Sequence, residues 1–197
     1  MALSWNPKTW VASELVDHAD MNLEIRDHLG AVVRVLDRDV TVTTVASTVT
    51  ETTVYTYTIP ANTLSTDRAV RLTHYGLLTN NTGVDRTPTI RLKFGGTTLF
   101  AYAPTLATNA TGRLWTVHAI VAPANATNAQ RTSFESMIST PTADANLANA
   151  DGHGFGRHFG LTVDTTATVT IAVTMQHSVS DANMTYAAHT TFLELMP

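Results

Sequence analysis

The sequence TVTIAVTM, residues 168–175, decides the fold class. Along it, apolar side chains alternate with threonine and alanine, at Val169, Ile171, Val173 and Met175. A period of two is typical of a β-strand with one face in a core and the other toward solvent. The same alternation recurs from residue 40 onward, at residues 55–59, 70–75, 89–94, 115–121 and 186–196. The pattern predicts strands over most of the chain.

Turn residues separate these strands. Gly95-Gly96 directly follows the run 89–94, which predicts a two-residue hairpin with residues 97–102 as the return strand. Threonine, 36 of the 197 residues, is β-branched and suits the half-solvated face of a sheet. No second helical pattern of useful length interrupts the strands. The prediction is therefore a mainly β domain over residues 39–197, a sandwich of jelly-roll type with about eight strands.

Residues 1–38 differ from the rest, and we interpret them as an N-terminal arm and one short helix that anchor the protein. Trp5 and Trp10 lie in a segment without a period, and side chains of this size need a surface to pack on. Asp17 is a suitable N-cap for a helix over about residues 18–30. Apolar residues at spacings of three and four trace one helical face, which extends toward Leu36: Met21, Ile25, Leu29, Val32 and Leu36.

Composition limits the classes of protein to consider. The formal net charge is −4, 14% of the residues are charged and no basic block is present, so nucleic-acid binding is not expected. No apolar run approaches the roughly 18 residues that span a membrane. The first ten residues lack the basic start and apolar core of a signal peptide, so we expect synthesis in the cytoplasm. Cysteine is absent, so core packing or subunit contacts must supply the stability.

One glycine-rich segment, DGHGFGRHFG at Asp151–Gly160, stands out in the β region. Asp151, His153 and His158 are of the residue types that bind divalent metals. Their spacing matches no metal motif. We therefore interpret the segment as a flexible loop, whose glycines allow positive φ, before a strand that begins at Arg157.

Sequence signatures of enzymes are missing as well. There is no G-x-S-x-G nucleophile elbow and no phosphate loop with a GK[ST] ending. Ser178 and His177 can be combined on paper with Asp164 or Asp181 into a triad, but in a β protein with eight histidines such combinations arise by chance. We expect a protein that is not an enzyme and has no catalytic residue, cofactor or metal.

Two parts of the chain resemble known proteins. The N-terminal part has a tryptophan followed by the pattern ADxN…IRDxL, at Trp10, Ala19–Asn22 and Ile25–Leu29. It resembles a segment at the start of small phage virion structural proteins, where it precedes a variable β-rich body. Thr50–Leu64 and Leu92–Leu99 resemble the opening strand and central hairpin of phage decoration, head-spike and tail-associated sandwiches.

The resemblance implies a virion component that is assembled in the host cytoplasm. Our first hypothesis is a capsid decoration protein that stabilises the shell by bridging neighbouring capsid subunits. A homotrimer fits the local threefold axes of an icosahedral shell. The partner would be the major capsid protein or another virion protein, with no contact to nucleic acid or membrane. The expected docking residues are Trp5, Trp10, Leu15, Met21, Ile25, Arg26 and Leu29.

Two other classes of function stay open. A tail-associated module that binds a receptor or a carbohydrate would use exposed aromatic and Asn/Asp side chains in the long loops, such as Tyr102, Asn109, Asn146 and Asp151. An enzyme on a jelly-roll scaffold would need a metal or a carboxylate pair, which the sequence does not clearly supply.

Overall fold

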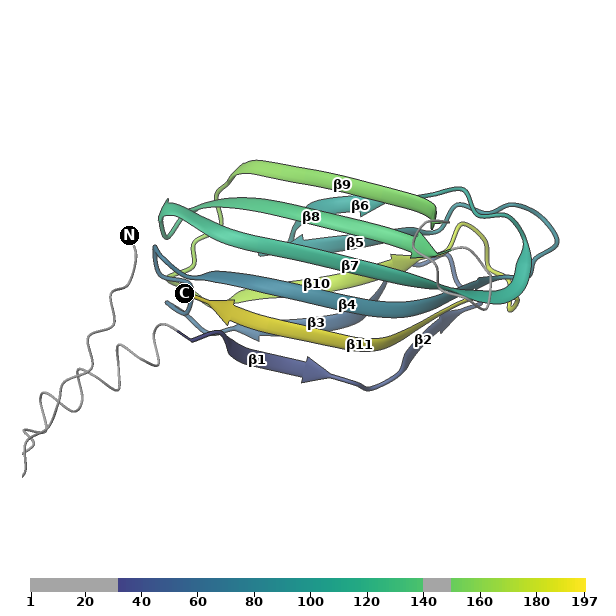
Figure 1. Ribbon diagram of the computed structural model, residues 1–197, viewed down its shortest axis with the longest axis horizontal. Helices are drawn as coiled ribbons and strands as arrows, with labels where there is room; N and C mark the ends of the chain where they lie inside the picture. Colours follow the sequence, from purple (N-terminus) through teal and green to yellow (C-terminus); the bar gives the residue numbers. More distant parts are fainter. Residues whose placement is uncertain (1–31, 140–149) are drawn as a thin grey trace, which may run out of the picture. The chain divides into compact units, whose positions relative to one another are not determined.

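Two antiparallel sheets form a β-sandwich in the computed structural model, which describes residues 32–139 and 150–197 (Figure 1). The predicted fold class is confirmed, because every element in the described residues is a strand. No helix in these residues is long and apolar enough to cross a membrane. The described residues form eleven strands, where about eight were predicted. They are β1 Arg34–Asp39, β2 Thr43–Ala46, β3 Thr52–Ile59, β4 Ala69–Asn80, β5 Thr89–Phe94, β6 Thr97–Tyr102, β7 Asn109–Ala126, β8 Ala129–Ser139, β9 Ala150–Leu161, β10 Val169–Gln176 and β11 Met184–Met196.

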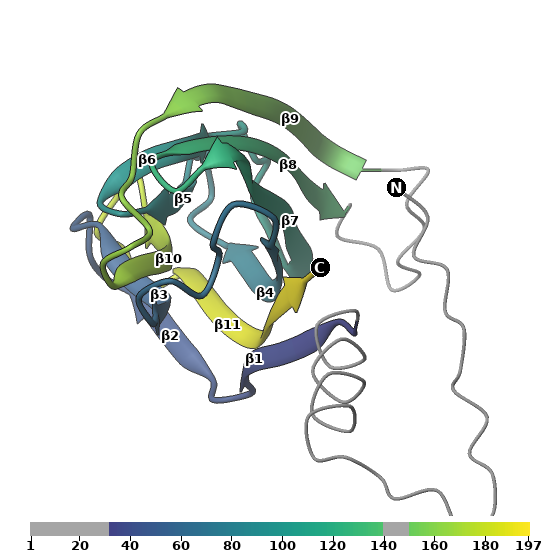
Figure 2. The same cartoon turned by 90° about the vertical axis from the view of Figure 1, so that its left-hand side faces the viewer.

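The larger sheet has seven strands in the order β1-β11-β4-β7-β8-β9, with β2 also paired to β11. The smaller sheet has the order β3-β10-β5-β6. Figure 2, which looks along the strands, shows the two sheets face to face. Every pairing between these strands is antiparallel, so each sheet can bury one face in the core and leave the other to solvent.

The stretch that decided the prediction forms β10, in the middle of the smaller sheet between β3 and β5. Its four alternating apolar side chains, from Val169 to Met175, are all buried. The predicted hairpin is confirmed too, since β5 and β6 pair across Gly95 and Gly96. Both glycines have positive φ, 57° and 81°, which side chains other than glycine rarely adopt.

Trp115 lies at the centre of the core and is completely buried. Its indole nitrogen Nε1 donates a hydrogen bond to Ser136 Oγ at 2.7 Å. The rings of Tyr102 and Tyr186 meet it edge-on, each with a centroid 6.2 Å from that of Trp115. Aromatic pairs prefer this geometry, and a buried indole N–H needs an acceptor. The core is thus held by both packing and a satisfied polar group.

The sandwich begins before residue 39, because β1 starts at Arg34 and pairs with β11. The Tyr55 hydroxyl donates a hydrogen bond to Asp37 Oδ2 at 3.0 Å, which ties β1 to a strand of the smaller sheet. Leu36 is therefore in a strand, and the helical pattern does not extend that far. The helix predicted over residues 18–30 lies outside the described residues.

The glycine-rich segment is not a loop, and this part of the prediction is wrong. It forms β9, an edge strand of the larger sheet that pairs with β8 along Gly152–Phe159. Glycine is required at positions 154 and 156 because aromatic rings fill the space that a larger residue's Cβ would need. An added Cβ would lie 2.9 Å from the ring of Tyr102 at Gly154, and 1.8 Å from the ring of Phe134 at Gly156.

Substitution of Gly156 by alanine should therefore destabilise the sandwich. We expect Gly156→Ala to lower the free energy of unfolding by about 1–3 kcal/mol, as overpacked cores do, and Gly154→Ala to cost less because its contact is looser. Urea unfolding would measure both. In a Phe134→Leu background, where the clashing ring is gone, the cost of Gly156→Ala should fall. If the two alanine variants lost equal free energy of unfolding, or if Gly156→Ala lost as much in the Phe134→Leu background, aromatic contacts would not explain why glycine is needed.

Candidate functional site

The outer face of the larger sheet, directed away from the smaller sheet, carries a cluster of polar side chains on β4, β7 and β8. They alternate with core residues: Leu72, for example, is completely buried in β4, whereas its neighbours Arg71 and Thr73 lie on the outer face. The antiparallel register brings polar side chains from separate parts of the sequence together on this face. His118 lies opposite Glu135, and Ser133 lies opposite Ile120.

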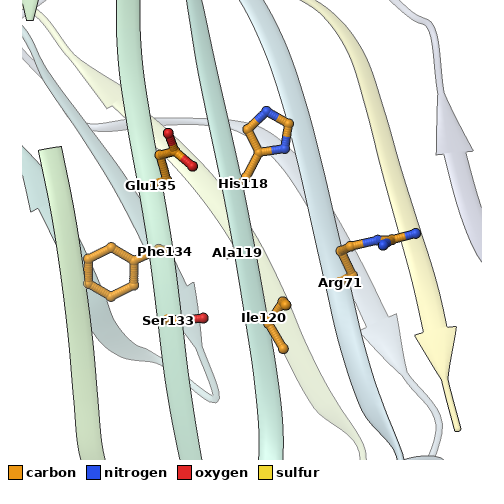
Figure 3. Close-up of a pocket in the computed structure, with 7 residues that line it drawn as sticks. All are labelled: Arg71, His118, Ala119, Ile120, Ser133, Phe134 and Glu135. Atoms are coloured by element: carbon orange, nitrogen blue, oxygen red, sulfur yellow. The ribbon is translucent and has the colours of Figure 1, made fainter. Parts of the chain in front are cut away.

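A groove of about 280 Å³ runs over these strands, and we call it the outer groove (Figure 3). In Figure 3 the imidazole of His118 and the carboxylate of Glu135 lie at one end, Ile120 and Ser133 at the other, and Arg71 projects from the neighbouring strand. The lining residues are Arg71, His118, Ala119, Ile120, Ser133, Phe134 and Glu135.

Charges in the outer groove are partly neutralised by neighbours. Arg71 Nε donates a hydrogen bond to Glu194 Oε2 at 2.8 Å, and this contact raises the pKa of Arg71. His118 Nδ1 lies 3.5 Å from Thr73 Oγ1, and the ring of Tyr75 meets the imidazole edge-on at a centroid distance of 5.9 Å. The groove therefore offers hydrogen-bonding groups of both kinds rather than a single strong charge.

Exposed apolar side chains lie on the same face of the larger sheet as the outer groove. Leu77 and Leu114 lie opposite each other on β4 and β7 and are 40% and 36% exposed. Ile120, within the groove, is 37% exposed. Apolar and polar side chains are thus both exposed on this face of the sheet.

The outer groove does not assemble a nucleophile with a base. Ser133 and His118 are on neighbouring strands, but no hydrogen bond joins them in the described part of the chain. Such a bond is the geometric signature of an activated serine. The arrangement can bind and orient a partner through hydrogen bonds and apolar contacts.

The four residues that the sequence offered for a catalytic triad all make structural contacts instead. His177 is buried, donates from Nε2 to the Val45 carbonyl at 3.0 Å, and has its pKa lowered by that burial. Ser178 Oγ accepts from the backbone N–H of Thr87 at 3.2 Å. Asp164 and Asp181 each accept a backbone N–H two residues further on, from Thr166 and Asn183. The structure does not bring these four residues together as a triad.

The candidate metal-binding histidines of the sequence lie on β9, where His153 is opposite Met137 and His158 is opposite Thr132. In the part of the chain that the structure describes, no group of three or more His, Cys, Asp or Glu side chains is arranged to hold a metal ion. The seven docking residues expected from the sequence, from Trp5 to Leu29, lie outside the described residues.

The loop residues considered for carbohydrate binding form no common site in the structure. Tyr102 is half-buried and packs on Phe100 and Trp115 in the core. Asn109 Oδ1 accepts the backbone N–H of Thr111 at 2.8 Å, a local turn contact. Asp151 lies on β9, and Asn146 is outside the described residues.

A chain of buried polar side chains links β4 and β11 within the larger sheet. His74 is completely buried, with Nε2 2.7 Å from the Tyr186 hydroxyl and Nδ1 2.7 Å from Thr191 Oγ1. Both ring nitrogens thus have partners in the neutral form. Burial lowers the pKa of His74 to about 4, against the opposing effect of the Asp39 carboxylate.

The buried His74 predicts acid sensitivity. Between pH 6.5 and pH 4 the unfolded chain protonates this residue while the folded chain does not, so the free energy of unfolding falls as the pH falls, by about 3 kcal/mol in all. The conservative variant His74→Gln can still bond both partners and should lose less stability over this range. Urea unfolding of the wild type and the variant at pH 7 and pH 4.5 would measure how much stability each protein loses. Other titrating groups, such as His177, are present in both proteins, so the difference between the two losses belongs to His74. If both proteins lost the same free energy of unfolding between these pH values, the assignment of the acid sensitivity to His74 would be wrong.

A second charged cluster lies on the smaller sheet, at Glu51. Its carboxylate oxygen Oε1 is 2.5 Å from Lys93 Nζ and accepts the Thr174 hydroxyl at 2.6 Å. Arg91 NH1 lies 3.6 Å from the other oxygen. The hydrogen bonds from Lys93 and Thr174 lower the pKa of Glu51. This cluster joins β5 and β10 to the segment before β3.

Sequence reasoning did not find the outer groove. His118 is recognisable as a strand histidine, but its neighbours Arg71, Ser133 and Glu135 are distant in the chain. Only the register of β4, β7 and β8 brings them together. No spacing motif encodes such a set, because each strand contributes one or two residues.

Comparison with known proteins gives structural likenesses at low identity. No family model and no curated protein matches the chain. It is similar to the CBM2 module of the evolved Dit of Lactobacillus casei BL23 phage J-1, with 10% identity and a TM-score of 0.38 over 71% of this chain and 67% of that chain. It is also similar to a chain in the structure of infectious bursal disease virus Gx strain, with 12% identity and a TM-score of 0.31 over 99% of this chain and 36% of that chain. A chain in the crystal structure of the infectious bursal disease virus VP2 subviral particle is similar as well, with 17% identity and a TM-score of 0.25 over 83% of this chain and 43% of that chain. The chain thus spans less than half the length of these two infectious bursal disease virus chains.

Proposed function

We propose that the protein is a structural component of a phage particle. The observation that carries this proposal is that Val33–Pro197 forms a compact unit with a hydrophobic core of its own. The preceding segment, which holds Trp5 and Trp10 and the virion-like pattern, lies outside that unit. A self-sufficient body behind an aromatic-rich segment suits a protein that is fixed to a larger assembly.

Within the particle, capsid decoration fits best. A decoration protein stabilises a shell by bridging neighbouring subunits, which requires a rigid body and at least two contact surfaces. Long antiparallel strands supply the rigid body, with 12, 18 and 13 residues in β4, β7 and β11. The first surface is the N-terminal segment, docked on the major capsid protein or another virion protein through Trp5, Trp10, Leu15, Met21, Ile25, Arg26 and Leu29.

The outer groove, together with the exposed apolar side chains on the same sheet face, is the second contact surface of this proposal. Leu77, Leu114 and Ile120 would bury apolar area against a neighbour, while His118 and Glu135 would set the orientation by hydrogen bonding. Three copies around a local threefold axis remain the arrangement that we propose on the shell.

Particles assembled without the protein provide the test. Purified protein added to them should bind at a fixed ratio to the capsid protein and raise the temperature at which the shell comes apart, because a ligand of the assembled state stabilises it. Failure to bind, together with absence of the protein from purified wild-type particles, would overturn the proposal.

A tail-associated receptor- or carbohydrate-binding module is the second candidate, and the outer groove is the observation that favours it. Its imidazole, carboxylate and hydroxyl groups are of the kinds that hydrogen-bond sugars. Host surface polysaccharide should then bind the protein, and His118→Ala and Glu135→Ala should weaken that binding. A protein that binds capsids but not polysaccharide excludes this alternative.

A further inference from the structure

His177 is a buried histidine that lies outside the outer groove and directly follows β10. Its Nε2 lies 3.0 Å from the Val45 carbonyl oxygen of β2. A carbonyl oxygen can only accept a hydrogen bond, so the proton of the neutral imidazole is on Nε2. Nδ1 then carries a bare lone pair, and this buried atom has no hydrogen-bond partner in the part of the chain that the structure describes.

The contact of His177 is one of three that we together call the clasp. Gln176 Nε2 donates to the Val49 carbonyl at 2.9 Å, and Ser180 Oγ donates to the Ser47 carbonyl at 2.7 Å. The three side chains thus bind every second carbonyl along the end of β2 and the segment after it. The clasp lies at the end of the sandwich opposite the C-terminus, where β10 ends beside β2 (Figure 1).

The segment 47–50, between β2 and β3, relies on the clasp for its position. Among the described residues, no backbone-to-backbone hydrogen bond outside the strands involves this segment. Ser47 has a φ of 52°, in the left-handed region that residues other than glycine rarely adopt. Such a conformation persists only where surrounding contacts hold it. Strand β2, which leads into the segment, has only four residues and pairs with β11.

The three hydrogen bonds of the clasp are not equivalent. Those from Gln176 and Ser180 are exposed, so water competes for their carbonyl acceptors. The bond from His177 is buried, and a buried carbonyl that loses its donor is costly. His177 therefore contributes most to keeping the clasp closed.

We propose that the clasp is an acid-sensitive switch, in which protonation of His177 releases β2 and residues 47–50 while the rest of the sandwich stays folded. The added proton would be on Nδ1, as a buried N–H without an acceptor on a charged ring. Both features are costly in the closed state, whereas water binds the ring in the open state. The open state therefore takes up the proton more readily, and a lower pH favours opening.

The charged groups near the clasp do not offset this cost. The segments that contact it carry the following titratable or charged side chains: Glu51 before β3, Asp85 and Arg86 between β4 and β5, Asp181 before β11, and Tyr186 and His189 on β11. None of them contributes to the pKa of His177, which burial lowers against the opposing effect of the Val45 carbonyl. A histidine in an open segment has a pKa of about 6.5, so opening is favoured below that pH.

This inference does not depend on the proposed function. It also differs from the acid sensitivity of His74, which concerns the unfolding of the whole sandwich. The opening of the clasp concerns β2 and the segment after it.

Hydrogen exchange of the full chain at pH 7 and pH 5 is the test. Protection factors, which correct for the pH dependence of intrinsic exchange, should fall by about tenfold or more for the β2 amides between these pH values. At both pH values the β2 amides should be less protected than those of β10, as local opening requires. Equal protection in β2 and β10 would mean that the segment opens only with the whole sandwich, and would overturn the proposal. An unchanged protection of β2 would overturn it too.

Two variants assign the effect to His177. His177→Gln keeps a donor for the Val45 carbonyl but cannot be protonated, so the protection of β2 should agree within about twofold at the two pH values. His189→Gln, the matched replacement of an exposed histidine on β11, should retain the wild-type fall. If β2 lost as much protection in His177→Gln as in the wild type, the switch would not be His177.

Nuclear magnetic resonance of the wild-type imidazole gives a readout that needs no variant. His177 should be the Nε2–H tautomer at pH 7, and in the folded protein it should titrate below pH 6.5. This result would support the proposal even if His177→Gln did not fold. An Nδ1–H tautomer, or a titration at or above pH 6.5, would overturn it.

Discussion

Replacement of Trp115 by alanine should lower the free energy of unfolding by about 3–5 kcal/mol, the largest effect on stability that we expect from one substitution. The side chain is completely buried and meets Tyr102 and Tyr186 edge-on. Its removal would leave a cavity between the sheets and also deprive the buried Ser136 hydroxyl of its donor. Since a domain has only about 5–15 kcal/mol in total, a large part of the stability would be lost.

Trp115→Phe is the matched control, because it keeps a ring but removes the N–H donor. It should cost clearly less than the alanine variant. Urea unfolding followed by far-UV circular dichroism would measure both. If Trp115→Ala cost under about 1 kcal/mol, the core would not be organised around this residue.

The double variant Trp5→Ala/Trp10→Ala should bind particles more than about a hundredfold more weakly than the wild type. Each tryptophan buried in a partner's pocket is worth about 2 kcal/mol or more at a hot spot, and each 1.4 kcal/mol is a factor of ten. Stability should change little, because the compact unit that contains the core begins at Val33. Deletion of residues 1–32 should have the same two effects: a folded sandwich and lost binding.

Lys8→Ala, in the same segment, is the control for the loss of a large side chain that is not aromatic. Binding of each purified variant to particles that lack the protein would be titrated by co-sedimentation. If both the double variant and the deletion bind as tightly as the wild type, the anchor lies in the sandwich. A deletion that cannot fold would instead assign the segment to the core.

The alternation in residues 168–175 and in the similar runs along the chain was enough to predict the sandwich, because each residue's face in a strand follows from its place in the sequence. The hairpin at Gly95-Gly96 was predictable for a similar reason, since the turn depends on local backbone freedom. The short strands β1 and β2 were not predicted. Their places are set by pairing with β11, a partner about 140 to 160 residues further along the chain.

The error at β9 has a specific physical cause. When only local preferences are considered, glycine at every second position indicates a flexible segment. Here the missing side chains are replaced by the rings of Phe134 and Tyr102, which come from two other strands. The outer groove was missed for the same reason, since register alone places His118 beside Glu135. Long-range pairing is what the sequence conceals in an antiparallel β protein.

Electron cryomicroscopy of intact particles is the most direct test of the claim that the protein decorates a phage capsid. The account predicts density for an eleven-stranded sandwich on the outside of the shell, with its N-terminal segment against the capsid protein and its body touching a neighbouring subunit. Density at the tail instead would contradict capsid decoration and favour the receptor-binding alternative. Absence of such density from the whole particle would contradict a structural role in the virion.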